Sequence, residues 1–165
     1  MIKTILGLMV LIAMLSSSCA RETNVFEYWI FKDTTYTAIS CTASGATVLG
    51  LNGGTQAGSA TGNSLSIKFG SGFVPVSPGT YTVSVGDTSP TNPNQVSIIL
   101  DKGYNATTSS GGTSYYATGG NGRTQTVQVV TNTTGISITG SGIMMRNYAS
   151  AGDSTTLDFN VSPTK

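Results

Sequence analysis

Residues 64–69 read Ser-Leu-Ser-Ile-Lys-Phe, with large apolar side chains at Leu65, Ile67 and Phe69 and polar side chains between them. Successive side chains of a β-strand point to opposite faces, so this alternation predicts a strand with one dry and one solvated face. Residues 80–85, Thr-Tyr-Thr-Val-Ser-Val, repeat the pattern. Strands of this kind are typical of sheets that pack on one face, so we expect an all-β protein.

The two-residue period continues to the end of the chain, at Val96, Ile98 and Leu100, at Val127 and Val129, at Ile136 and Ile138, and at Leu157, Phe159 and Val161. Segments 25–31, 36–43, 46–51 and 114–118 bring the expectation to about ten short strands, with Gly-rich connections at 50–62 and 109–122 as surface loops. These connections are too short for crossover helices, which predicts antiparallel pairing.

We therefore expect an antiparallel β-sandwich of the immunoglobulin-like or jelly-roll-like kind. A closed barrel is the alternative, and the sandwich is favoured because strand lengths vary and four prolines interrupt the middle of the chain, at Pro75, Pro78, Pro90 and Pro93. Residues 140–142, Gly-Ser-Gly, fit a bulge in a long strand or a tight turn equally well.

The first residues have the three parts of an export signal, with Lys3 followed by an apolar stretch at 5–15 and by three serines before Cys19. The apolar stretch is shorter than the roughly 20 residues that a membrane-spanning helix needs. The pattern predicts a signal peptide at 1–18, a linker at 19–24 and one domain at 25–165, a size suited to a single core.

Small residues directly before Cys19 resemble the lipobox of bacterial lipoproteins, in which the cysteine thiol receives a diacylglycerol. The usual leucine is displaced by one position, to Leu15. The alternative is ordinary cleavage near residues 18–20, which leaves Cys19 as a thiol. If Cys19 is acylated, Cys41 has no disulfide partner; its place beside Ile39 and Ala43 in the alternation predicts an inward-facing thiol.

Four segments are similar to small Bacteroidetes-type lipoproteins with one β-sandwich domain: Phe-Lys-Asp-Thr-Thr-Tyr-Thr-Ala at 31–38, Gly-Thr-Tyr-Thr-Val at 79–83, Gly-Ile-Ser-Ile at 135–138 and Leu-Asp-Phe-Asn at 157–160. The first segment departs from the pattern, because Thr34 stands where Gly usually follows the Asp of the hairpin turn. The resemblance implies the fold and an outer-membrane lipid anchor, with palmitate on Cys19. It implies no activity and no site.

The charge balance speaks against nucleic acid as a partner. Loss of residues 1–18 removes Lys3 and leaves seven basic and seven acidic residues, and only 9% of the whole chain is charged. A protein that binds the phosphate backbone usually carries a positive patch.

The residue types also speak against an enzyme. The chain has no histidine, which is the commonest general base and metal ligand. No recognisable pair stands out among the acidic residues Glu27, Asp33, Asp87, Asp101, Asp153 and Asp158, and calcium at 87–94 would have a single carboxylate. We therefore expect no catalytic residue, no metal and no cofactor.

Aromatic side chains are the candidate ligand-binding residues, because flat rings pack against the faces of sugars. The main candidates are Trp29, Tyr28, Tyr115 and Tyr116, with Tyr104 and Tyr148 also available. For Trp29, packing in the core is favoured over an exposed platform. Tyr115 and Tyr116 are adjacent, so their side chains must diverge within a strand.

The sequence thus predicts a lipid-anchored envelope protein with a non-catalytic binding or structural module. One alternative is a surface glycan-binding lipoprotein. The other is a fimbria-like adhesive subunit, in which the strand at 25–31 pairs with the sheet edge of another chain.

Overall fold

The computed structural model describes residues 27–53, 62–86, 88–104, 112–118, 124–132 and 135–164. The predicted signal peptide, Cys19 and the linker at 19–24 lie outside these residues, as do Asp87 and parts of both Gly-rich loops. The regular elements in the described ranges are all strands. None of the described residues belongs to a helix with the length and hydropathy of a membrane span.

Eleven strands follow one another in the described ranges: β1 (Tyr28–Phe31), β2 (Thr34–Thr37), β3 (Ser40–Ser44), β4 (Thr47–Asn52), β5 (Gly62–Phe69), β6 (Gly79–Val83), β7 (Gln95–Tyr104), β8 (Thr113–Ala117), β9 (Thr126–Asn132), β10 (Gly135–Asn147) and β11 (Ser154–Val161). Hydrogen bonds connect them in the order β2-β1-β11-β10-β9-β6-β7-β5-β4-β3, and β8 pairs with both β10 and β7.

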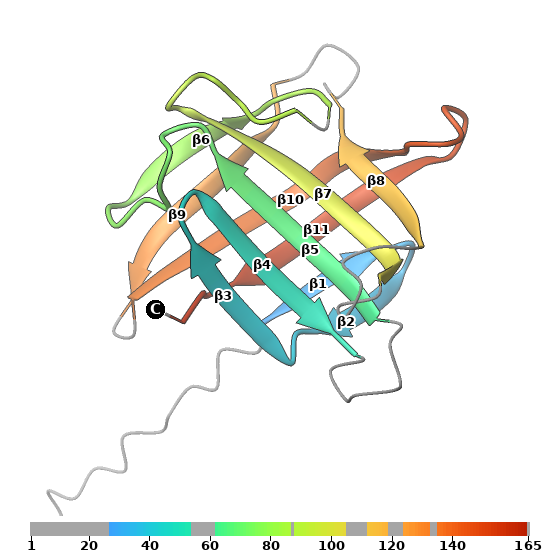
Figure 1. The fold of residues 1–165 in the computed structure, drawn as a ribbon, viewed down its shortest axis with the longest axis horizontal. Coiled ribbons are helices and arrows are strands. Elements are labelled where there is room, and N and C mark those ends of the chain that lie inside the picture. The colour runs from blue at the N-terminus through green and yellow to red at the C-terminus, as the bar shows by residue number, and fades with distance from the viewer. Residues whose placement is uncertain are drawn as a thin grey trace, which may run out of the picture.

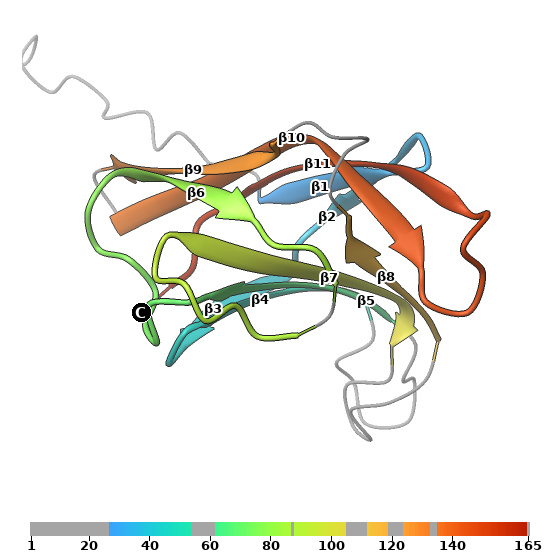
Figure 2. The ribbon, with the colours of Figure 1, turned by 90° about the horizontal axis from the view of Figure 1, so that it is seen from above.

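The strands form two layers, which Figure 2 shows edge-on, with β1, β11, β10 and β9 in one layer and β7, β5, β4 and β3 in the other. The layers are joined on one side, because β6 pairs with β9 and β7 while β8 pairs with β10 and β7. Figure 1 shows that the strands of the two layers cross one another. The expectation of an all-β, sandwich-like fold is confirmed.

One pairing differs from the antiparallel expectation. β6 and β7 run parallel through the pairs Thr82↔Gln95 and Val83↔Val96, whereas the other strand pairings are antiparallel. β6 reaches from one layer to the other, and the described residues of the connection to β7, 84–86 and 88–94, contain no helix. The alternation of apolar and polar residues does not distinguish a short parallel pairing from an antiparallel one, so the sequence could not predict it.

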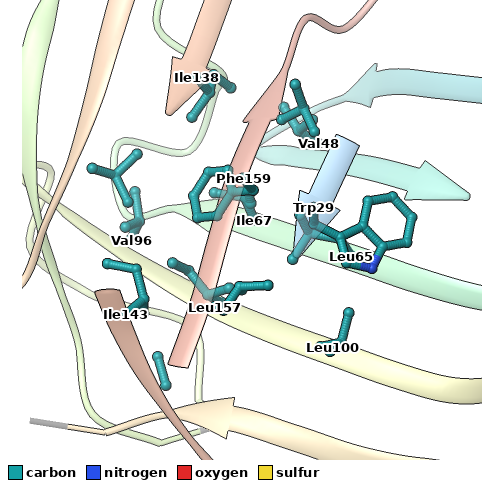
Figure 3. Close-up of a cluster of buried hydrophobic side chains, with 14 of the residues drawn as sticks. Trp29, Val48, Leu65, Ile67, Val96, Leu100, Ile138, Ile143, Leu157 and Phe159 are labelled. Carbon is teal, nitrogen blue, oxygen red and sulfur yellow. The ribbon is translucent and has the colours of Figure 1, made fainter. Parts of the chain in front are cut away.

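The apolar side chains of the alternating segments fill the space between the layers, as Figure 3 shows around Phe159 and Leu157. Buried positions include Leu65, Ile67, Phe69, Val96, Ile98, Leu100, Val127, Val129, Ile138, Leu157, Phe159 and Val161. Close packing across β10 and β11 requires a glycine, because a Cβ on Gly140 would overlap the Phe159 ring. The core therefore follows the sequence pattern closely.

Two apolar residues do not follow it. The segment at 36–43 is not one strand, because the chain bends at residues 38–39 between β2 and β3 and leaves Ile39 57% exposed. Val85 is 63% exposed because β6 ends at Val83. The inward direction predicted for Cys41 is confirmed, since its thiol is buried.

The two uncertain turns are resolved. The register of β10 against β11 shifts between Gly140 and Ile143, so residues 140–142 form a bulge. In the β1–β2 hairpin Phe31 pairs with Thr34, and both residues between them are left-handed, with φ of 49° at Lys32 and 59° at Asp33. Two left-handed residues define a type I′ turn, which here forms without glycine.

Candidate binding cleft

A cleft of about 580 Å³ opens between β7, β8 and the connection that follows β10. Its volume falls within the range of roughly 300–1,000 Å³ that is usual for small-molecule sites. We call it the tyrosine cleft, and its lining residues are Ile99, Asp101, Gly112, Thr113, Ser114, Tyr115, Tyr116, Asn147, Tyr148 and Ala149.

Backbone hydrogen bonds position the walls of the tyrosine cleft. β8 lies between β7 and β10, with Tyr116 opposite both Ile99 and Arg146. The N–H of Tyr148 donates to the carbonyl of Ser114 over 2.9 Å, and the N–H of Ala149 donates to Oδ1 of Asn147 over 2.8 Å. The connection after β10 is thus held against β8.

The aromatic rings of Tyr116 and Tyr148 line the tyrosine cleft. The rings of Tyr116 and Tyr148 meet edge to face, with centroids 5.9 Å apart and planes at 78°. Tyr148 is 66% exposed and Tyr116 is half-buried. One ring is therefore fixed by its strand, and the other presents most of its surface to solvent.

A carboxylate lies on the same wall. Oδ1 of Asp101 accepts a hydrogen bond of 2.5 Å from the Ser114 hydroxyl, and Oδ2 accepts a longer one of 3.4 Å from the buried Ser64 hydroxyl. These bonds orient the carboxylate. A carboxylate oxygen accepts more than one hydrogen bond, so a ligand hydroxyl can still be bound.

An ion-pair cluster adjoins the tyrosine cleft and shares Asn147 and Tyr115 with it. Nζ of Lys32 lies 2.7 Å from Oδ1 of Asp153, and it also donates to the Tyr115 hydroxyl over 3.0 Å. Oδ2 of Asp153 accepts from the Tyr115 hydroxyl over 2.8 Å and from Nδ2 of Asn147 over 3.1 Å. The cluster thereby ties the β1–β2 turn to the β10–β11 connection.

The charges in this cluster stabilise one another. Hydrogen bonds from Lys32, Asn147 and Tyr115 lower the pKa of Asp153 to about 2. Hydrogen bonds to Asp153 and to Tyr115 raise the pKa of Lys32. Both groups therefore keep their charge over the whole physiological pH range.

The four aromatic candidates fall in three different places. Trp29 is fully buried and stacks on Tyr36 with ring centroids 5.9 Å apart, so it offers no platform and packs in the core. Tyr28 lies on the outer face of β1 and lines a second open hollow, of about 600 Å³, together with Asp158 and Asn160.

Tyr115 and Tyr116 diverge, as expected for neighbours in a strand. The Tyr115 ring is buried and meets the Phe31 ring edge-on at 4.7 Å, with its hydroxyl in the ion-pair cluster. Tyr116 points to the tyrosine cleft.

Sequence reasoning missed the ion-pair cluster. Lys32 and Asp153 are 121 residues apart and belong to turns, so no spacing or motif connects them. Asp101 belongs to no recognisable motif, and its place on a strand ahead of a Gly-rich loop is only a weak signal. Tyr148 was recognisable only as an aromatic residue.

No group of three or more histidine, cysteine, aspartate or glutamate side chains within the described ranges is arranged to hold a metal ion. Burial is the larger cause and the nearby Glu27 carboxylate the smaller cause that together raise the pKa of the Cys41 thiol to about 12.

Comparisons of the chain with protein-family models, with curated proteins and with solved structures found no match.

Proposed function

We propose that the protein is an exported bacterial lipoprotein, anchored through Cys19 to the outer membrane, and that its sandwich is a non-catalytic binding module. The proposal of export and of a lipid anchor rests on the short apolar stretch followed by Ser-Ser-Ser-Cys at 16–19. β1 begins at Tyr28, only a few residues later, so an acylated Cys19 would hold the domain close to the membrane. Two or three acyl chains make such an anchor stable.

The anchor is tested by labelling the full chain with radioactive palmitate in a bacterial host and by separating its membranes. We expect label in the protein and the protein in the outer-membrane fraction. Cys19→Ala should lose both, whereas the matched variant Cys41→Ala should keep both, because Cys41 is inside the sandwich. An unlabelled protein, or an unchanged fractionation of Cys19→Ala, contradicts the proposal.

The tyrosine cleft favours a saccharide as the ligand of this module. A sugar ring has apolar C–H faces and a rim of hydroxyls, so it needs flat apolar surface together with oriented polar groups. Tyr116 and Tyr148 supply the rings, and Asp101 supplies an oriented carboxylate. Because the mature chain has little charge, a neutral glycan fits better than a polyanion.

Binding is tested on a glycan array and then by calorimetry with the glycans that bind. Tyr148→Ala and Asp101→Asn should each weaken binding by about 10- to 100-fold, which corresponds to about 1.4–2.8 kcal/mol. Tyr28→Ala, on the outer face of β1, is the control and should bind normally. A functional array without signal contradicts the glycan proposal and leaves the anchor proposal standing.

Strand addition through residues 25–31 is the weaker alternative. β1 pairs with β2 on one side and with β11 on the other, so neither of its edges is free for another chain. The end strands of the sheet order are β2 and β3, and Thr164 already pairs with Thr42 of β3. Detergent-resistant ladders on unheated gels would be needed to revive this alternative.

A further inference from the structure

The connection between β5 and β6 presents apolar side chains to solvent. In the sequence Phe-Val-Pro-Val at 73–76, Phe73 is 61% exposed and Val76 is 67% exposed. Val74 between them is partly buried against the core, and its N–H donates to the carbonyl of Gly45 over 3.0 Å. The connection is therefore held in place while two large apolar side chains point outward.

These residues border an apolar groove of about 250 Å³. The groove is lined by Ala43, Gly45, Phe73, Val74, Pro75, Val76, Gly135, Ile136 and Pro163, none of which carries a charge. We call this surface the apolar patch. Neighbouring exposed apolar residues in a fixed loop are more informative than scattered ones, because they mark surfaces that meet another apolar body.

β10 places the apolar patch and the tyrosine cleft at opposite ends of the molecule. Its first residues, Gly135 and Ile136, line the patch, and its last residue, Asn147, lines the cleft. A strand of 13 residues spans about 40 Å. Figure 1 shows β10 crossing the width of the sandwich.

The chain enters the domain nearer to the patch. Tyr28 at the start of β1 pairs with Asn160, and Asn160 pairs with Thr139 of β10. Along β10, Thr139 is about 10 Å from Ile136 but about 25 Å from Asn147. Glu27 also accepts a backbone hydrogen bond from Ser162, the neighbour of Pro163 in the patch.

The length of the linker limits how far the patch lies from the anchor. The eight residues at 19–26 span at most about 26–29 Å when fully extended. If Cys19 is acylated, Glu27 is therefore within that distance of the bilayer surface. The uncharged patch lies on the side of the domain from which the linker leaves.

We infer that the apolar patch rests on the lipid bilayer, with Phe73 and Val76 in the interface, and that this contact turns the tyrosine cleft away from the membrane. The inference rests on the proposed lipid anchor. It adds a second, weaker membrane contact, which fixes the orientation of the anchored domain.

The experiment uses the acylated full-length protein in phosphatidylcholine vesicles whose acyl chains are brominated near the headgroup. Phe73→Trp introduces an indole at the patch, and Tyr148→Trp is the matched variant at the cleft. The native Trp29 is fully buried and supplies a constant background. Floated vesicles are collected, and tryptophan emission is compared with that in unbrominated vesicles.

We expect the indole of Phe73→Trp to lose about half of its emission, because apolar side chains at the interface sit roughly 5–10 Å into the boundary of headgroups and acyl chains. The indole of Tyr148→Trp should keep its emission. A protein that floats with both indoles unquenched overturns this inference and leaves the anchor intact. A protein that does not float overturns the anchor and this inference together.

A second copy of the chain is the other possible occupant of the patch. In that case the indole of Phe73→Trp would shift to the blue as the protein-to-lipid ratio rises, with no effect of bromine. That result would overturn the bilayer contact and assign the patch to self-association.

Discussion

The two ends of β10 differ sharply in chemistry. At the Gly135 end, the groove beside Phe73 is lined without a single charged side chain. At the Asn147 end, the tyrosine cleft contains Asp101, and the adjoining cluster pairs Lys32 with Asp153. One strand, with a bulge at 140–142, thus connects an apolar surface to a polar one.

The difference comes from the connections, not from the strand. The Gly135 end is covered by the β5–β6 connection and by residues 162–164, which are apolar or small. The Asn147 end receives the β1–β2 turn and the β10–β11 connection, which bring the charges. In this sandwich the strands build the core, and the connections give each end its chemical character.

The largest expected effect concerns the thiol of Cys41 in β3, the strand whose Ala43 lines the groove at the Gly135 end, and it tests whether the core is closed beside that strand. Only the thiolate reacts with alkylating reagents, so a pKa of about 12 in place of 9.0 should slow the reaction at pH 8 about a thousandfold. The measurement is the labelling rate with and without urea. Fast labelling of the folded protein would show that the core is open beside β3.

The number of thiols in urea is a further check on the anchor. The acylated protein should show one thiol in urea, from Cys41. Two thiols would mean that Cys19 is unmodified.

The second prediction concerns a substitution in the middle of β10, which should destabilise the sandwich as a whole and therefore both ends of the strand. Gly140→Val places a side chain into the Phe159 ring, and overpacking of this kind costs at least about 1–3 kcal/mol. The urea midpoint should fall accordingly. Thr139→Val, at the half-buried neighbouring position, is the control and should change the midpoint little. Equal midpoints would show that β11 moves away from β10 at no cost.

Much of the fold was predictable, and the reason is physical. Burial of Leu65, Ile67 and Phe69 requires a two-residue period, so alternation identifies both the strand and its inner face. The same argument wrongly predicted that Ile39 is buried. The chain bends between β2 and β3 at residues 38–39, and no glycine or proline there indicates the bend in the sequence.

The candidate site was less predictable. Tyr116 was identified as an aromatic candidate, but its partner Tyr148 lies in the connection after β10. The pairing of β8 with β10 and the backbone hydrogen bond from Tyr148 to Ser114 bring the two rings together. Lys32 and Asp153 meet because two turns lie at the same end of the sandwich. Such contacts depend on the strand order, which alternation does not encode.

The third prediction concerns acid and only the Asn147 end. The folded-state pKa of Asp153 is about 2, below its ordinary value of 3.8, so its stabilising effect is complete above about pH 4. This effect is lost as the pH falls from 4 towards 2. Amide hydrogen exchange of residues 147–153 should therefore accelerate at pH 2.5 relative to pH 4, after correction for intrinsic rates.

Asp153→Asn is the matched variant for this effect. It should exchange faster at neutral pH and show a smaller additional change in acid, while residues 135–138 behave alike in both proteins. Equal acid sensitivity in the two proteins would contradict the role of the ion pair.

The smallest expected effect tests the strain in the β1–β2 turn that carries Lys32 to the cluster. Asp33 has a φ of 59°, and the second position of a type I′ turn favours glycine. Asp33→Gly should therefore stabilise the protein by about 0.5–1 kcal/mol, and Asp33→Ala should destabilise it. Urea unfolding checks the order Gly, Asp, Ala. Because Lys32 still reaches Asp153 in the glycine variant, exchange at residues 147–153 should stay slow; faster exchange would mean that Asp33 itself holds the Asn147 end in place.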